Sequence, residues 1–358
     1  PTWVRRLDLM AQIIRVAIDG MGGDNAPDMI VGGIDRASKV LDDVEFLLFG
    51  DEARLRPLLD AHAGANAVTE IRHTDEAISA EEKPTVALRT GKKSSMRLAI
   101  DAVKSGEASA LVSAGNTGAL MAMATVVLRT LPGIDRPAIA AALPTLRSQT
   151  VMLDLGANID CNADNLVQFA VMGEVYARAE IGLAQPSIGI LNVGVEGLKG
   201  NDAVKEASAI LQSSDLPIKF YGFIEGDDIG KGTVDVVVTD GFTGNVALKT
   251  AEGAVNMFSH HLRTALKSSL RTKLGALLSM PALQIVKNKF DARRYNGAMF
   301  VGLNGICIKS HGGTDAVGFG NALGVAVNLV RRDFNEVIKE DLSRVMQNDR
   351  PEIKAAVN

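Results

Sequence analysis

A repeated order of apolar strand, small-residue turn and helix runs along most of this chain, and it constrains the fold more than any other feature. The first unit joins an expected strand at residues 13–19, a glycine-rich turn at 20–27 and a helix at 28–41. Strands that alternate with helices form mostly parallel sheets that helices cover on both faces. The sequence therefore predicts an α/β fold. Further strands are expected at 44–49, 68–72, 108–111, 138–143, 150–155, 187–191, 218–221 and 234–239, and helices at 52–61, 84–104, 119–128, 164–179 and 202–211.

The clearest strand-to-helix turn lies between the apolar runs 108–111 and 119–128. Its residues are small, and they include Ser113, Gly115, Asn116, Thr117 and Gly118. Several backbone N–H groups at a helix start have no intrahelical partner, and the helix dipole favours negative charge there, so this turn can bind a phosphate or a carboxylate. Many such turns are rich in glycine only because the chain must turn. A plain turn is the alternative.

Turns of similar composition occur at 156–158, 192–194, 240–245, 295–297 and 304–305, and most of them follow apolar runs. In a parallel sheet such turns meet at one edge, where ligands bind in open α/β folds. Glycine admits close approach of a ligand, and Asn or Thr supplies neutral hydrogen-bonding groups that suit an oxyanion or a polarised carbonyl. The further candidates for this edge are Asp154, Asn158, Asn192, Asp240 and His311.

Cations are few among these turns. Lys199 lies in the glycine-bounded loop 194–200, after an expected strand and before an expected helix. A lysine in a loop is more often solvated than catalytic, but the two glycines and the preceding strand favour a role for Lys199. His311 is either a structural hydrogen-bond donor or an acid or base.

Several enzyme classes find no support in the sequence. The first turn lacks the G-x-G-x-x-G pattern and the following acidic residue of a nicotinamide site. There is no G-x-S-x-G elbow, Cys161 has no evident histidine partner, and the five histidines form no metal-binding pattern. No cofactor and no metal are therefore expected. Direct attack between two bound substrates remains, and inorganic phosphate suits it because its dianion needs positioning more than deprotonation.

The overall composition indicates a cytoplasmic protein that does not bind nucleic acid. The chain has 38 basic and 42 acidic residues, a net charge of −4, and two cysteines with no disulfide or metal-ligand spacing. It has no spanning apolar run and no signal-peptide pattern. We expect an N-terminal extension at residues 1–12, one compact unit at 13–335 and a helical tail at 336–358.

One segment departs from this average. Residues 246–278 read as a long helical stretch with leucines recurring on one face, and from Arg263 to Arg294 the chain has eight Lys or Arg and one Asp, a local charge of +7. The plain interpretation is a helix that packs its leucines on a neighbour or on a second copy. The alternative is a basic, apolar tip at about 262–290 that touches an anionic membrane or an acidic protein.

Taken together, the turns resemble one known family. The stretches 19–24 (DGMGGD), 113–119 (SAGNTGA), 153–158 (LDLGAN), 192–194 (NVG), 239–245 (TDGFTGN) and 309–312 (KSHG) occur in the order typical of PlsX, the bacterial acyl-carrier-protein:phosphate acyltransferases. The resemblance runs from about Arg15 to Asp333. It implies a homodimer with an α/β/α sandwich similar to phosphotransacetylase and isopropylmalate dehydrogenase.

The resemblance implies transfer of a long fatty acyl group from acyl carrier protein to inorganic phosphate. The acyl phosphate would feed a glycerol-3-phosphate acyltransferase in phospholipid synthesis, and the protein would be peripheral at the membrane through its helical tip. The family's functional lysine falls on Lys199 and its asparagine on Asn245, which would polarise the thioester carbonyl, while the Ser113 turn would hold phosphate. One departure is residues 195–198 (VEGL), where acidic residues are expected beside the lysine.

Two other functions remain open at this point. The first is a short-chain phosphate acyltransferase that acts on an acyl-coenzyme A. The second is a non-catalytic scaffold that binds acyl carrier protein or membrane. Phosphate-dependent release of carrier-protein thiol distinguishes an enzyme from the scaffold.

Overall fold

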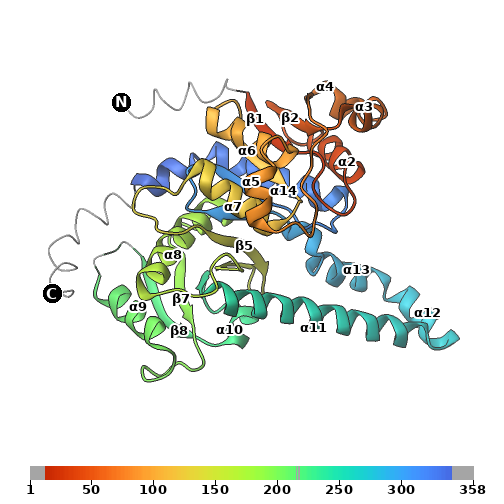
Figure 1. The fold of residues 1–358 in the computed structure, drawn as a ribbon. Coiled ribbons are helices and arrows are strands. Elements are labelled where there is room, and N and C mark those ends of the chain that lie inside the picture. Colours follow the sequence, from red (N-terminus) through yellow and green to blue (C-terminus); the bar gives the residue numbers. More distant parts are fainter. Residues whose placement is uncertain (1–12, 215, 217, 341–358) are drawn as a thin grey trace.

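A single mixed sheet forms the centre of the molecule (Figure 1). The computed structural model describes residues 13–340 except 215 and 217, and within these residues eleven strands lie in the order β3-β2-β1-β4-β11-β10-β5-β6-β9-β7-β8. The strands are β1 (Ile14–Asp19), β2 (Val44–Gly50), β3 (Thr69–His73), β4 (Ala110–Ser113), β5 (Ala138–Pro144), β6 (Gln149–Leu153), β7 (Ser187–Leu191), β8 (Lys219–Ile224), β9 (Val236–Val238), β10 (Ala298–Val301) and β11 (Ile306–Lys309).

The sheet changes direction at its middle. β1, β2, β3, β4 and β11 run parallel to one another, and so do β6, β7, β8 and β9. Between these two halves, β11 with β10, β10 with β5 and β5 with β6 are antiparallel pairs. Three reversals leave the second half running against the first. A mostly parallel sheet is confirmed, and the reversal is new.

Helices cover both faces of the sheet, so the molecule has three layers. Val16 and Ile18 of β1 pack in one apolar cluster with the helices α2 and α14, whereas the intervening Ala17 packs in a second cluster with α6 and α7. Successive side chains of a strand point to opposite faces, which explains this division. The expected α/β/α sandwich is confirmed.

The helices are α2 (Asp28–Ala37), α3 (Glu52–Asp60), α4 (Ala63–Ala67), α5 (Pro84–Thr90), α6 (Ser95–Ser105), α7 (Thr117–Leu128), α8 (Ala163–Tyr176), α9 (Asp202–Ser213), α10 (Gly226–Lys231), α11 (Gly241–Lys267), α12 (Leu270–Leu278), α13 (Met280–Lys289) and α14 (Ala316–Arg331), with a π-helix η2 (Ala177–Ile181) and a 3-10 helix η3 (Ala292–Tyr295).

The single helix expected at 84–104 is wrong, because the chain breaks between α5 and α6. Gly91 ends α5, and the Ser94 side chain caps α6 by accepting the N–H of Arg97. A Cβ at Gly91 would lie 2.4 Å from Ile78 Cδ1, so only glycine fits this turn without a shift of its neighbours. The stretch 246–278 also divides, at Ser268 and Ser269, into α11 and α12.

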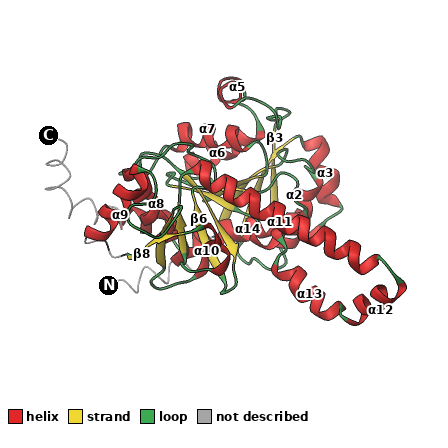
Figure 2. Ribbon diagram, turned by 90° about the horizontal axis from the view of Figure 1, so that it is seen from below, coloured by secondary structure: helices red, strands yellow, loops and turns green. Residues whose placement is uncertain are grey.

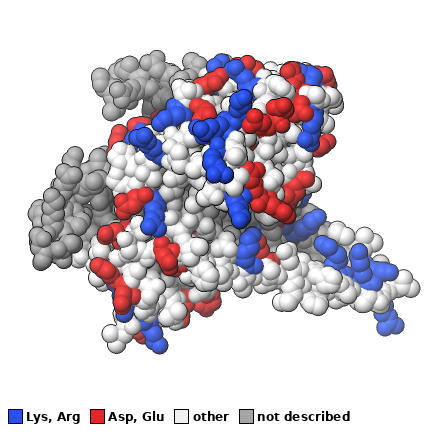
Figure 3. Space-filling model, in the orientation of Figure 1, with Lys and Arg blue, Asp and Glu red and all other residues white. Residues whose placement is uncertain are grey.

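Helices α11, α12 and α13 form a hairpin arm that extends away from the body (Figure 2). In α11 only Gly241 and Gly244 are buried, and in α12 and α13 no residue is. The arm exposes leucines such as Leu270, Leu274 and Leu278, and its Lys and Arg side chains show as blue patches in Figure 3. The expected basic, apolar tip therefore exists as a free surface of this chain.

Among the described residues, every helix is too short or too polar to cross a bilayer. The expected extension at 1–12 lies outside the described residues, as does most of the expected tail. Residues 334–340 are helical, and Phe334 and Ile338 are fully buried.

Candidate functional site

The strand directions divide the expected site turns into two groups. The Ser113 rim consists of the loops after β1, β4 and β11, with Asn296 at the start of β10. The Asn245 rim consists of the loops after β6, β9 and β7. Because β6, β9 and β7 run against β4 and β11, the rims lie at opposite ends of the strands of one sheet. The prediction that all of these turns share one edge is therefore wrong.

The two rims are also far apart along the sheet. Four strand intervals separate β4 from β6 and six separate β4 from β7. At about 4.8 Å per strand these intervals correspond to roughly 20 and 30 Å. Within one chain, the Ser113 turn and Lys199 are thus too distant to act on the same atoms.

A buried carboxylate organises the Ser113 rim. Asp19, the last residue of β1, accepts hydrogen bonds from Ser95 Oγ at 2.6 Å and from Ser113 Oγ at 2.7 Å. Burial raises the pKa of Asp19, and the two serine hydroxyls oppose that rise. A Cβ at Gly22 would lie 2.4 Å from Asp19 Oδ2, which explains the glycine in the DGMGGD turn. The carboxylate thus fixes three loops relative to one another.

The polar side chains of the Ser113 turn are used within the protein. Ser113 Oγ accepts the N–H of Gly115 at 3.0 Å as well as donating to Asp19. Asn116 caps α7 by accepting the N–H of Ala119. Its Nδ2 group donates to the carbonyls of the strap at residues 75–83, namely those of Ser79, Ala80 and Glu82.

Backbone groups of the turn remain for a ligand. Thr117 and Gly118 are the first residues of α7, so their N–H groups have no acceptor within that helix. Thr117 is exposed, and the turn is partly open to solvent. These backbone N–H groups are the part of the turn that could hold an anion, so the phosphate site stays a prediction, and the side chains of Ser113 and Asn116 shape the turn.

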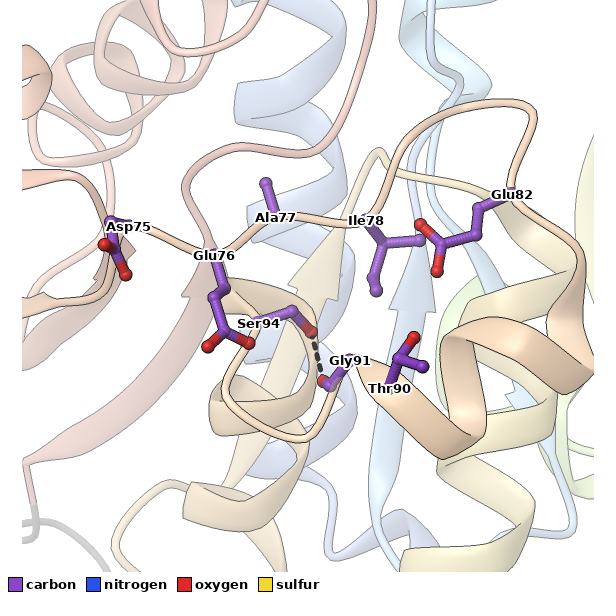
Figure 4. Close-up of a pocket in the computed structure, with 8 residues that line it drawn as sticks. All are labelled: Asp75, Glu76, Ala77, Ile78, Glu82, Thr90, Gly91 and Ser94. Carbon is purple, nitrogen blue, oxygen red and sulfur yellow. Dashed lines mark hydrogen bonds between the residues drawn. The ribbon is translucent and has the colours of Figure 1, made fainter.

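A pocket of about 340 Å³ lies beside the strap (Figure 4). Its lining includes three carboxylates, those of Asp75, Glu76 and Glu82, and its floor is the turn where Ser94 Oγ donates to the carbonyl of Gly91 at 2.7 Å. Acidic walls repel an anion. This pocket is therefore unsuited to phosphate, and nothing in the sequence indicated it.

The loop after β11 contributes Lys309 and His311 to the Ser113 rim. The His311 N–H donates to Asn296 Oδ1 at 2.8 Å, and its Nδ1 accepts the N–H of Gly313 at 3.1 Å. An accepting Nδ1 leaves the proton of a neutral ring on Nε2. His311 is thus held in place by the backbone, and its exposed ring reaches solvent.

A second buried carboxylate organises the Asn245 rim. Asp154 accepts the backbone N–H groups of Ile139 at 3.0 Å, Gly156 at 3.1 Å, Ala157 at 2.9 Å and Asn158 at 2.7 Å, and also Asn158 Nδ2 at 2.9 Å. Neutral N–H donors satisfy a buried carboxylate without a cation. Both of its oxygens are used, so Asp154 shapes the loop at 154–158 instead of presenting a charge to a ligand.

The start of α11 packs directly on that loop. The N–H of Gly241 donates to the carbonyl of Asn158 at 2.7 Å, and Asp240 caps the helix by accepting the N–H of Thr243 at 2.8 Å. A Cβ at Gly244 would lie 1.9 Å from the carbonyl oxygen of Asp154. Asn245 then reaches across, and its Nδ2 donates to the carbonyl of Leu155 at 3.1 Å. One N–H of that amide is left for a ligand.

The loop after β7 presents Lys199. Asn192 closes the loop, because its Nδ2 donates to the Lys199 carbonyl at 3.1 Å and its Oδ1 accepts the N–H of Val193 at 2.9 Å. Lys199 is exposed. So are the apolar side chains around it, with Val193 at 78% and Leu198 at 94%. The Asn245 rim therefore combines an exposed cation with exposed apolar groups.

Cys161 lies beside the Asn245 rim, where its partly buried thiol faces the Asn158 carbonyl. Burial, with the carboxylates of Asp154 and Asp240 nearby, raises the pKa of Cys161 to about 11, so it is a thiol rather than a nucleophilic thiolate at neutral pH. The described residues contain no group of His, Cys, Asp and Glu that could hold a metal ion. The sequence did not single out Asp19, Ser95 or Lys309 as site residues, although 19–24 and 309–312 stand among the family motifs. Asn296, in the expected turn 295–297, does lie in the Ser113 rim.

Comparisons with known proteins agree with these motifs. The family model described as fatty acid synthesis protein matches residues 14–337. The phosphate acyltransferase of Rhodospirillum rubrum is 60% identical over 336 residues, and that of Paramagnetospirillum magneticum is 59% identical over 336 residues; each match covers 94% of this chain and 96% of the relative.

Solved structures of low sequence identity share the fold. The EutD phosphotransacetylase of Staphylococcus aureus matches with a TM-score of 0.58 at 16% identity, over 91% of this chain and 98% of that one. A phosphotransacetylase of Streptococcus pyogenes matches with a TM-score of 0.59 at 18% identity, over 93% and 99%. The expected likeness to phosphotransacetylase is thus confirmed for the fold. With the family model matched over most of its length and relatives at this identity, the chain belongs to the fatty acid synthesis protein family, the PlsX family that its motifs resemble.

Proposed function

We propose that this protein transfers a long-chain fatty acyl group from acyl carrier protein to inorganic phosphate, giving an acyl phosphate for phospholipid synthesis. The observation that carries this proposal is the close identity, over nearly the full chain, with relatives named phosphate acyltransferase. A phosphate oxygen attacks the thioester carbonyl, a C–O bond forms, the C–S bond breaks and the carrier-protein thiolate leaves and takes up a proton. A glycerol-3-phosphate acyltransferase would consume the product.

The two rims have different tasks in this proposal. The backbone N–H groups at the start of α7 hold the phosphate dianion. Lys199 and the free N–H of Asn245 polarise the thioester carbonyl and stabilise the oxyanion that forms as phosphate attacks. The exposed valines and leucine beside Lys199 suit a substrate with an apolar tail.

A homodimer could bring the two rims together, although they are far apart within one chain. Reacting atoms must approach to about 3 Å, whereas the rims of one chain are separated by four to six strand intervals. We therefore propose that the Asn245 rim of one copy faces the Ser113 rim of its partner. Exposed apolar residues of α11, such as Val246, Met257 and Phe258, provide surface for such a contact.

The same proposal includes a cytoplasmic, peripherally membrane-associated enzyme whose acyltransferase domain spans 13–335. The hairpin arm supports this location, because it carries exposed leucines together with cations between Arg263 and Lys289 that form no ion pair among the described residues, whereas Lys249 nearer the body pairs with Glu252. An anionic bilayer attracts such a combination. The arm would keep the enzyme beside the lipid pathway that it supplies.

Thiol release tests the reaction directly. Purified protein is mixed with palmitoyl carrier protein, and free carrier-protein thiol is measured with and without inorganic phosphate. We expect release that depends on phosphate and a product that hydroxylamine traps as a hydroxamate. Absence of phosphate-dependent release would contradict the proposed function, and equal activity on short acyl-coenzyme A would contradict the proposed substrate.

A further inference from the structure

Lys309 occupies a place in the Ser113 rim that the proposed reaction does not yet use. It is the last residue of β11 and pairs in register with Ser113, the last residue of β4. Its Nζ donates to the carbonyl of Ala114 at 3.3 Å and to the carbonyl of Ser310. The ammonium therefore lies between the two loops that follow these strands, directly beside the turn at 113–118.

The charge of Lys309 has no counter-ion in contact. Among the described residues no carboxylate lies within ion-pairing distance of its Nζ. Asp19 is near, but its two oxygens are bonded to Ser95 and Ser113. Two carbonyl acceptors leave one of the three ammonium hydrogens unused. A partly buried cation without a contacting anion is costly, and an anionic ligand would remove that cost.

Titration of Lys309 points the same way. Burial lowers its pKa to about 8, against the opposing attraction of Asp19, Asp24 and Cys307, the titratable groups that act on it from the neighbouring loops and from its own strand. A dianion bound in contact with the ammonium would raise that pKa. Ligand binding and protonation of Lys309 are then linked.

We propose that Lys309 is the cation that binds the substrate phosphate, with its third N–H donating to a phosphate oxygen held at the start of α7. This inference rests on the proposed function and adds to it a residue that sets affinity for the acyl acceptor. Lys309 acts on phosphate alone. Lys199 and Asn245, on the other rim, act on the thioester.

Phosphate titration calorimetry on the full-length protein tests this assignment. Lys309→Met keeps the side-chain length and removes the charge, and we expect phosphate affinity to fall at least about tenfold, with a matching rise in the KM for phosphate. The KM for palmitoyl carrier protein is expected to stay unchanged. Lys309→Arg, which keeps the charge, should retain more affinity than the Met variant. Lys92→Met, at an exposed lysine of the α5–α6 turn, is the matched control and should bind phosphate like the wild type.

Each outcome separates this inference from the proposed function. Wild-type affinity in a folded Lys309→Met protein would overturn the role of Lys309 and leave the reaction in place. Loss of phosphate-dependent thiol release in the wild type would instead contradict the reaction. If the Met variant does not fold, the pH dependence of phosphate binding to the wild type tests the assignment instead. Its phosphate affinity should fall about tenfold per pH unit above pH 8, with proton uptake on binding. A phosphate affinity that stays constant up to pH 9.5 would overturn the assignment.

Discussion

Each of the two rims contains a buried aspartate at a strand end, but the groups that surround the two carboxylates differ. Asp19 shares its surroundings with the ammonium of Lys309 and is bonded by serine hydroxyls. Asp154 instead accepts four backbone N–H groups and the side-chain amide of Asn158. The first arrangement leaves a cation available for an anion. The second makes a rigid support that positions Asn245 and the start of α11.

This difference predicts that changes in the Asn245 rim act on turnover. We expect Lys199→Ala and Asn245→Ala each to lower kcat about a hundredfold or more, because each removes a donor to the developing oxyanion. The KM for phosphate should change little. The measurement is steady-state thiol release, with circular dichroism to check the fold. Lys205→Ala, on the neighbouring helix α9, is the control. Wild-type turnover in Lys199→Ala would show that the Asn245 rim takes no part in the reaction.

A second prediction concerns the rigid support. Gly244→Ala places a Cβ 1.9 Å from the Asp154 carbonyl oxygen, a contact that the packed backbone cannot relieve. We expect the free energy of unfolding to fall by about 3 kcal/mol in denaturant titrations. Gly253→Ala is a matched control in the same helix, where a new Cβ meets nothing within 4 Å, and it should stabilise by up to about 1 kcal/mol. Equal effects at both glycines would show that the close approach is unimportant.

A third prediction extends the comparison to the arm, which grows from the Asn245 rim. Leu274 and Leu277 are 60% and 65% exposed. Replacing both with Glu should weaken sedimentation with anionic vesicles about tenfold, because apolar contact is lost and like charges repel. Thiol release from the carrier protein in solution should persist. A control pair, Val126→Glu with Leu146→Glu, changes two exposed residues that are not part of the arm and should leave sedimentation unchanged.

The smallest expected effect lies where the two halves meet. Glu180, in η2 beside α14, has an Oε2 without a hydrogen-bond partner among the described residues, and burial raises its pKa to about 7. The pKa of Glu180 is higher in the folded state than its unfolded-state value near 4.5. The group therefore contributes stability below pH 4.5, and this contribution is lost as the pH rises through 7. Glu180→Gln should therefore stabilise the protein by about 1 kcal/mol at pH 8 and by almost nothing at pH 4. An equal gain at both pH values would exclude titration as the cause.

The sequence predicts much of this fold because each buried strand and each helix start has a local signature. Apolar runs gave β1, β2 and β7 nearly to the residue, and the caps Asn116 and Asp240 stand at the helix starts that the turns indicated. The strands β10 and β11 were not among the expected strands, although the turns at 295–297 and 304–305 flank β10. Strand direction has no local signature at all, so the division of the turns into two rims could not be predicted.

The candidate site follows the same rule. Lys199 and Asn245 were named from their motif, and their predicted roles remain proposals. Asp154 and Asn158 were expected at a ligand edge, but their polar atoms bond within the loop and its neighbours. Lys309 escaped notice because a lysine near a strand end looks solvated until the neighbouring loops are in place. Composition shows which groups are present, and only tertiary contacts show which of them remain free.

The order of the strands along the chain has a consequence for synthesis. β11 and α14, which follow the second half in the chain, complete the half that begins with β1 and α2: β11 pairs with β4, and Gly33 of α2 packs so closely on α14 that a Cβ there would lie 2.8 Å from Phe319 Cδ1. A nascent chain that has emerged only to β9 therefore exposes one edge of β4 and one face of α2 on the ribosome. The first half to be translated is the last to close.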